Sequence, residues 1–212
     1  PLGASEDMIF GTIDMEAALQ QGERRLRHGL LHRARNTFLY MDEVNLLRED
    51  ILSTVLKCAE DRFFRLERDG LSFTEEVSYT PVGTMDPAEG TLCPTLLDAF
   101  GLFVSMEDVT DPAQRREIAA RVLAFERDPA AFRASYAAQE EEFAASICRA
   151  RELLPRVAVP SAILHFAAAC VLRAHCVGNH AEIYLIEAAS ALAALAGSAF
   201  VMPMDVEESA EF

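Results

Sequence analysis

A short apolar run that ends directly in two carboxylates is the feature that most constrains this chain. The segment Phe38–Leu47 reads FLYMDEVNLL, in which Asp42 and Glu43 follow the apolar residues and a polar turn comes next. The apolar run has the length and composition of a buried β-strand. Its acidic end indicates one of two things. Either the strand simply ends in solvent, or one carboxylate holds Mg²⁺ and the next polarises a water molecule.

The second interpretation is the Walker B strand of a nucleotide-hydrolysing α/β domain. Its usual partner is a Gly-rich loop of the form GxxxxGK[ST], whose backbone amides hold the phosphates. No such loop occurs in the 212 residues. Considered alone, Asp42 and Glu43 therefore favour a strand end in solvent, and only further motifs could favour the Walker B interpretation.

The composition excludes several classes of partner. There are 34 acidic against 19 Lys and Arg residues, a formal charge of −15, which argues against nucleic acid and against an anionic membrane surface. The longest apolar run, Ala188–Met202, is interrupted by Ser and Gly and is short for a membrane span. The five cysteines include no CxxC pair, which fits a reduced compartment. We therefore expect a cytoplasmic protein with no membrane span and no nucleic-acid partner.

The order of expected elements divides the chain into two parts. Strands are expected at Thr37–Asp42, Val77–Thr84 and Leu102–Ser105, and Asp69-Gly70 predicts the turn of a hairpin. The later residues favour helices only, at 112–127, 130–154, 161–175 and 181–196, followed by a solvated acidic tail, EESAEF. Shorter helices are expected at 14–21, 46–59 and 95–99. We expect an α/β domain at 1–109 and an all-helical domain at 110–212.

An ordered series of segments then resembles one known family. PLGASEDMIFGTIDMEAAL, GLLHRARNTFLYMDEVNLL, RLERDGLSF, VGTMDPAEG and LCPTLLDAFGL are followed by DPAQRREIAARVLAFERDPAAF, LLPRVAVP and VGNHAEI. In this order they resemble the AAA+ ATPase subunit of the magnesium and cobalt chelatases, which drives metal insertion into tetrapyrroles. The resemblance implies an incomplete AAA+ P-loop core that lacks the Walker A part, followed by a helical lid. In the family the Gly-rich loop lies upstream of the segments matched here.

The same resemblance implies site residues, cofactors and partners. Asp42 would hold the Mg²⁺ that accompanies ATP, and Glu43 would orient the attacking water. The partners would be a homo- or hetero-oligomeric AAA+ ring and the other chelatase subunits. This chain alone is expected to be inactive, because it contains no phosphate-binding loop.

Three positions depart from the family's pattern. Asp86 stands where the first sensor is usually Asn, so a negative charge would face the γ-phosphate. Ala99 stands at the arginine-finger position, where a methyl group supplies no charge. His180 stands at the sensor position of the lid, where a neutral imidazole cannot replace a bidentate Arg. These departures imply impaired hydrolysis.

Three functions remain open at this stage. The first is a chelatase motor subunit, the second is a non-hydrolysing AAA+ scaffold kept for ring assembly, and the third is a MoxR-type ATPase that remodels another metalloenzyme. Asp42 and Glu43 favour the motor, whereas the three departures favour the scaffold. A metal site built from the C-terminal histidines and cysteines is disfavoured because they show no CxxC or HxxxH spacing. These residues are His165, Cys170, His175, Cys176 and His180.

Overall fold

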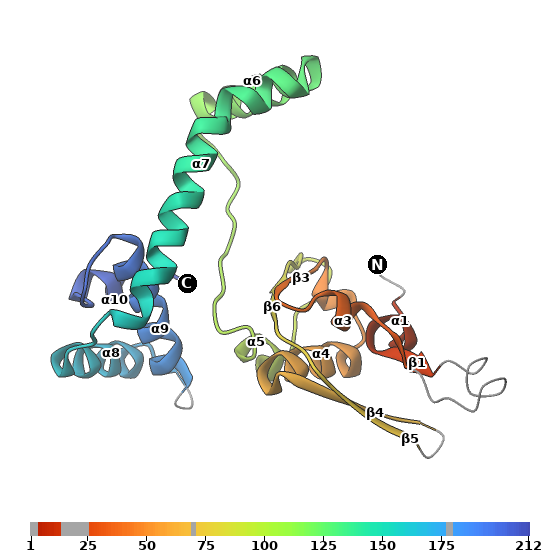
Figure 1. The fold of residues 1–212 in the computed structure, drawn as a ribbon. Coiled ribbons are helices and arrows are strands. Elements are labelled where there is room, and N and C mark those ends of the chain that lie inside the picture. The colour runs from red at the N-terminus through yellow and green to blue at the C-terminus, as the bar shows by residue number, and fades with distance from the viewer. Residues whose placement is uncertain (1–3, 14–25, 69–70, 177–179) are drawn as a thin grey trace. The chain divides into compact units, whose positions relative to one another are not determined.

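A computed structural model describes residues 4–13, 26–68, 71–176 and 180–212 of the chain. The chain divides into two compact units, Pro1–Gly101 and Leu102–Phe212. The division lies at Gly101, whereas the sequence placed it after residue 109. The first unit mixes strands and helices and the second contains helices, so the predicted order of an α/β part followed by a helical part is observed (Figure 1). The helix expected at 14–21 lies outside the described residues.

The first unit contains short elements around one parallel strand pair. In chain order its described elements are α1 (Glu6–Phe10), β1 (Gly11–Ile13), β2 (Leu26–His28), α3 (Leu30–Arg33), β3 (Thr37–Met41), the 3-10 helix η1 (Val44–Leu46), α4 (Glu49–Asp61), β4 (Phe63–Arg68), β5 (Leu71–Glu76), β6 (Tyr79–Gly83) and α5 (Pro94–Asp98). The strands form three two-stranded sheets, β1–β2, β3–β6 and β4–β5.

The parallel pair β3–β6 places the ends of two strands side by side. Its register runs from Thr37 opposite Tyr79 to Met41 opposite Gly83. Parallel strands have their carboxyl ends at the same edge, so the residues that follow Met41 and Gly83 meet there. The predicted strand before Asp42 is therefore confirmed, and it ends one residue earlier than expected.

Helix α4 packs into two hydrophobic clusters at once. Ile51, Val55 and Cys58 lie in a cluster with Leu31, Phe64, Val77 and Tyr79. Leu52 and Leu56 lie in a second cluster with Val44, Leu92 and Leu96. The two sets recur at helical spacing on neighbouring faces of the helix, which explains why α4 is the central helix of this unit. The buried hydroxyl of Tyr79 donates a hydrogen bond to the Val55 carbonyl at 2.6 Å.

The hairpin predicted around Asp69-Gly70 is observed. Strands β4 and β5 pair antiparallel from Phe63 opposite Glu76 to Arg68 opposite Leu71 (Figure 1). The two turn residues themselves lie outside the described part of the chain. Phe64 is buried and pairs with Glu75. Residues directly opposite in an antiparallel pair share a face of the ribbon, so Glu75 lies on the core-facing side of β5.

Gly29 lets the segment before β3 approach α1 and β1 closely. A Cβ atom at Gly29 would lie 2.3 Å from the Ile9 carbonyl oxygen and 2.5 Å from the Gly11 nitrogen. Both neighbours are backbone atoms and cannot rotate away. Only a glycine fits between β2 and α3, and it fixes the positions of the residues on either side.

The second unit consists of helices whose starts are set by Asp and Pro. Its elements are α6 (Pro112–Arg127), α7 (Pro129–Leu153), the 3-10 helix η2 (Leu154–Arg156), α8 (Ser161–Arg173), α9 (His180–Leu195) and α10 (Pro203–Ser209). Asp111 and Asp128 each accept hydrogen bonds from two backbone amides of the helix that follows. Each is followed by Pro, which is well suited to the first helical position.

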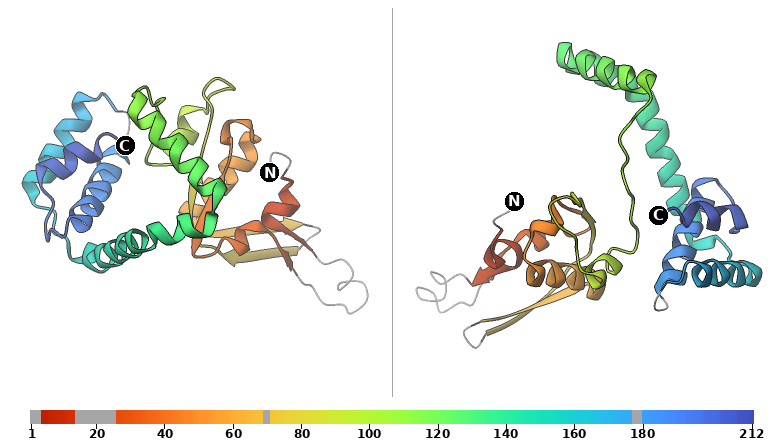
Figure 2. Two further views of the ribbon diagram at one scale, coloured as in Figure 1. Left: turned by 90° about the horizontal axis from the view of Figure 1, so that it is seen from above. Right: turned by 180° about the vertical axis from the view of Figure 1, so that it is seen from behind.

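The core of the second unit lies between α8, α9 and α10. Its buried residues include Ile163, Ala167 and Val171 of α8, spaced by four. Further buried residues come from α9, from the segment before α10 and from α10 itself, namely Leu185, Ala189, Ala193, Val201 and Val206. Helices α6 and α7 contain no buried residues. Figures 1 and 2 show α7 running from α6 toward the group formed by α8, α9 and α10.

One local prediction is wrong. Leu102–Ser105 is not a strand. A strand needs a neighbouring strand, and among the described residues no strand pairs with this segment. The three glutamates of the acidic tail are exposed as expected, although the tail begins within α10. In that helix the buried Ser209 hydroxyl donates to the Leu185 carbonyl at 3.2 Å.

Candidate functional site

The carboxyl edge of β3 and β6 is held together by the backbone of Thr84. The Thr84 amide donates to the Met41 carbonyl at 3.0 Å, and the Thr84 carbonyl accepts from the Val44 amide at 2.8 Å. The two loops that leave the strands are thus joined on both sides of Asp42 and Glu43. This places the acidic pair at a sheet edge of the kind where α/β proteins bind ligands.

Asp42 is an ionised and oriented carboxylate. Its Oδ1 accepts hydrogen bonds from the Thr84 hydroxyl at 2.7 Å and from the Tyr40 hydroxyl at 3.1 Å. These bonds, the Thr84 bond first, lower the pKa of Asp42 below its usual value. Both bonds reach Oδ1, and the residue itself is exposed. The group therefore suits a hard cation, which prefers oxygen ligands and keeps part of its water shell.

Glu43 occupies a sharp turn in the chain. Its backbone is left-handed, with φ 52° and ψ 55°, a conformation that is uncommon for residues other than glycine. The Glu43 amide lies 3.4 Å from the Thr84 hydroxyl oxygen. Both acids line a cavity of about 310 Å³ whose other walls are largely apolar and include Leu39, Met41 and Ile51. The turn places a half-buried carboxylate beside the exposed Asp42.

Asn45 joins the two loops at this edge. Its side-chain amide donates to the Asp86 carbonyl at 3.0 Å and to the Gly90 carbonyl at 3.1 Å. The Asp86 carboxylate accepts from the Ala88 amide at 2.9 Å, so it caps its own loop. Asp86 is exposed and follows β6 by three residues. The structure thus brings the loop that bears Asp86 to the same edge as Asp42 and Glu43.

The other two predicted site residues lie elsewhere. Ala99 is exposed and ends α5, which packs through Leu96 against Leu52 of α4. His180 is the first residue of α9 in the second unit, with its ring 6.1 Å from that of Tyr184. Three of the five predicted residues therefore share an edge in the first unit. Ala99 lies at a helix end in the same unit, and His180 belongs to the other unit.

Sequence reasoning missed Thr84 and Asn45. Both follow the strands of the parallel pair, and polar residues just after neighbouring parallel strands are the signal that could have identified them. It also missed a His-x3-His spacing at His28 and His32. Among the described residues, no three of the C-terminal histidines and cysteines bring ligand atoms within 4.8 Å of one another. Nor does any helix in the described ranges combine the length and apolar character needed to cross a membrane.

Comparison with known proteins assigns the chain to a family. Residues 165–212 match the model of the AAA lid domain, and all of them lie in the helical unit. A magnesium-chelatase subunit ChlI homolog of Methanocaldococcus jannaschii is 36% identical over 211 residues, which are 100% of this chain and 58% of that protein. The magnesium-chelatase 38 kDa subunit of Acidiphilium rubrum is 41% identical over 201 residues, or 95% of this chain and 58% of that protein.

A solved structure is also similar. It is a cryo-electron microscopy model of the complex between subunits BchI and BchD of magnesium chelatase, 36% identical, with a TM-score of 0.49. The match covers 99% of this chain and 65% of that chain. The chain spans somewhat more than half the length of the two curated relatives. The α/β unit and the helical unit correspond to the predicted AAA+ core and lid, and over nearly its whole length the chain is homologous to magnesium-chelatase subunits.

Proposed function

We propose that the chain is the ATPase-type AAA+ part of a tetrapyrrole metal chelatase, inserting magnesium or cobalt, in which ATP hydrolysis drives metal insertion within a ring. The observation that carries this proposal is the oriented carboxylate of Asp42, bound by Thr84 and Tyr40 at the end of a parallel strand. The similarity to magnesium-chelatase subunits supports the choice of reaction.

Asp42 would hold the Mg²⁺ that accompanies ATP. Its lowered pKa keeps the carboxylate ionised at neutral pH, and the two hydrogen bonds to Oδ1 orient it. Magnesium in nucleotide sites is bound through one or two carboxylates, waters and the phosphates themselves. The bound ion would neutralise charge on the phosphate oxygens. One exposed carboxylate matches the protein's share of such a site.

Glu43 would orient the attacking water. Glu43 follows Asp42 directly and has a left-handed backbone, and both acids line the same cavity, which supports this role. A carboxylate that is not occupied by Mg²⁺ can accept a proton from a water and align it for attack. Asn45 would hold the loop that bears Asp86 beside Asp42 and Glu43 through its hydrogen bonds to the Asp86 and Gly90 carbonyls.

Hydrolysis would be slow in a ring made only of this subunit. Ala99 offers a methyl group where the family uses an arginine finger, and a finger is worth about 10³ to 10⁵ in rate. Asp86 would add a negative charge at the first sensor, and His180 would donate at most a weak contact from the lid. The same three departures favour the alternative function, a non-hydrolysing AAA+ subunit that contributes to ring assembly.

Steady-state ATP hydrolysis by the full-length protein separates these functions. The samples are the unmodified protein, its Ala99→Arg variant, and a mixture with a relative that carries the finger. We expect slow turnover by the unmodified protein and a gain of about tenfold or more from either remedy. The gain should disappear in Glu43→Gln, which keeps the shape of the side chain but cannot act as a base.

The outcomes differ for the two candidates. A scaffold subunit would stay inactive in all three samples. Fast turnover by the unmodified protein alone would contradict both candidates, because it would mean that another residue supplies the missing charge. Arg115 and Arg116, at the start of α6, would be the first residues to test in that case.

A further inference from the structure

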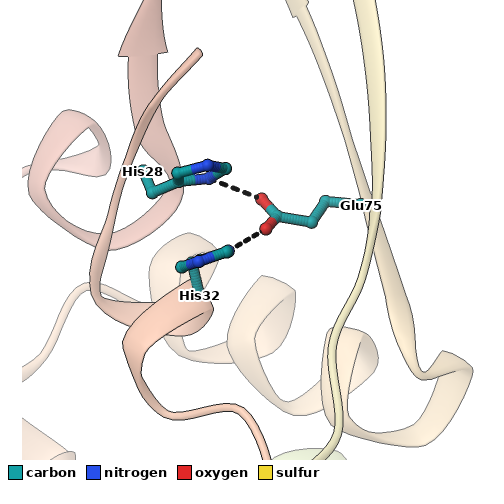
Figure 3. Close-up of side chains that lie close together, drawn as sticks. All are labelled: His28, His32 and Glu75. Carbon is teal, nitrogen blue, oxygen red and sulfur yellow. Dashed lines mark hydrogen bonds and ion pairs between the residues drawn. The ribbon is translucent and has the colours of Figure 1, made fainter.

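Two histidines and a glutamate converge in the first unit, away from Asp42 and Glu43. His28 is the last residue of β2, His32 lies in α3, and Glu75 lies in β5. His28 Nδ1 lies 3.3 Å from Glu75 Oε2, and His32 Nδ1 contacts the other oxygen, Oε1 (Figure 3). The two imidazole rings are stacked, with centroids 3.7 Å apart and planes 18° apart.

The fold places these three side chains together for identifiable reasons. The spacing of four residues and the close approach at Gly29 bring His28 and His32 onto one side of the chain. Glu75 is opposite the buried Phe64 and so faces inward, with only 14% of its side chain exposed. A carboxylate this shielded is costly unless it is paired. The two imidazoles are its partners, and they come from a segment more than forty residues away.

The donor set is that of a transition-metal site. One ligand atom from each residue lies within 4.8 Å of the others. Tetrahedral bonds of about 2.0–2.1 Å place ligand atoms about 3.3 Å apart, close to the separation of His28 Nδ1 and Glu75 Oε2. Two imidazole nitrogens and one carboxylate oxygen suit Zn²⁺ or Co²⁺, whereas Mg²⁺ prefers oxygen ligands alone.

We propose that His28, His32 and Glu75 bind one divalent transition-metal ion of the Zn²⁺ and Co²⁺ class. The ion would join the β4–β5 hairpin to the segment β2–α3 that leads into β3. With three protein ligands, a fourth position remains for solvent. Half of the His28 side chain and a third of the His32 side chain are exposed, so an ion can reach the ligand atoms. The site is separate from the proposed nucleotide site and does not depend on it.

Metal binding is measured on the untagged chain, without nucleotide, at neutral pH. Zn²⁺ affinity is obtained by competition with a chromophoric chelator, and Co²⁺ coordination by its visible absorption spectrum. We expect one ion per chain, and a loss of affinity of about tenfold or more in each of His28→Ala, His32→Ala and Glu75→Gln. Circular dichroism of each variant checks that it is folded.

A control variant locates the ion. His165→Ala removes a histidine of the helical unit whose Nδ1 lies 2.7 Å from the Ser161 carbonyl. It should bind Zn²⁺ and Co²⁺ like the unmodified chain. The proposal is overturned if the unmodified chain binds no stoichiometric ion, since the cluster would then be held by hydrogen bonds alone. It is also overturned if the three cluster variants keep their affinity.

If the cluster variants prove unfolded, hydrogen exchange of the unmodified chain tests whether the metal site exists. Zn²⁺ should then slow amide exchange in α3 and in β4–β5, and a chelator should reverse the effect. If the amide exchange rates of these segments are the same with and without Zn²⁺, the site is refuted, because an ion that joins the segments must stabilise them.

Discussion

Replacing Gly29 with Ala tests the close approach that organises the first unit. The added Cβ would lie 2.3 Å from the Ile9 carbonyl oxygen and 2.5 Å from the Gly11 nitrogen, far inside van der Waals contact. The backbone at Gly29, with φ −92° and ψ −163°, is open to alanine, so the penalty is steric only. Overpacking by one carbon costs about 1–3 kcal/mol, and a collision with two fixed backbone atoms belongs at the upper end.

Urea unfolding followed by hydrogen-exchange mass spectrometry measures each unit separately. A loss of about 3 kcal/mol, with a slope of about 1–3 kcal/mol per molar urea, lowers the midpoint of the first unit by about 1–3 M. The second unit should be unaffected. Gly197→Ala is the matched control, because Gly197 has φ +76° and no atom within 4 Å of the new Cβ. It should cost about 1–2 kcal/mol, in the second unit only.

An unchanged urea midpoint of the first unit in Gly29→Ala would refute the close approach. It would mean that α1 and β1 do not approach Gly29 as closely as described. The positions of His28 and His32 relative to Glu75 would then lose their structural basis as well.

Two further predictions concern the titrating groups of the first unit. Thr84→Val removes the stronger of the two hydrogen bonds that lower the pKa of Asp42, so that pKa should rise toward its usual value. Mg²⁺ binding by the full-length protein should then be lost at a higher pH on acidification but be little changed at neutral pH. Thr80→Val, in the preceding strand β6, is the control, and an unchanged acid limb in Thr84→Val would contradict the assigned bond. Burial first, with the nearby Asp61, raises the pKa of Cys58 to about 11. A thiol reagent at mildly alkaline pH should therefore modify the exposed Cys148 and Cys176 first and Cys58 last, as read by mass spectrometry, and early labelling of Cys58 would mean that α4 is not packed as described.

The sequence predicted best what local residues determine. The Asp-Gly dipeptide predicted the hairpin of β4 and β5, and the helices expected to begin at residues 112 and 130 begin at Pro112 and Pro129, because turns and helix starts depend on a few neighbouring residues. The end of β3 at the acidic pair was predicted for the same reason.

What the sequence did not reveal depends on contacts between distant segments. Glu75 reaches His28 and His32 only through the pairing of β5 with β4 and the packing of α3, which no local pattern encodes. Thr84 orients Asp42 across the parallel pair, 42 residues away in sequence. The prediction of a strand at Leu102–Ser105 was wrong because a strand forms only where a neighbouring strand supplies its backbone hydrogen bonds.

The position of α4 between two hydrophobic clusters has a consequence for how the first unit unfolds. Val55 and Cys58 serve one cluster while Leu52 and Leu56 serve the other, so neither cluster can open and leave α4 fully packed. Partial unfolding of the β4–β5 side would expose apolar area on the α5 side as well. The first unit should therefore behave as a single foldon, in which amides of β4 and of α5 exchange through one common opening with the same dependence on denaturant.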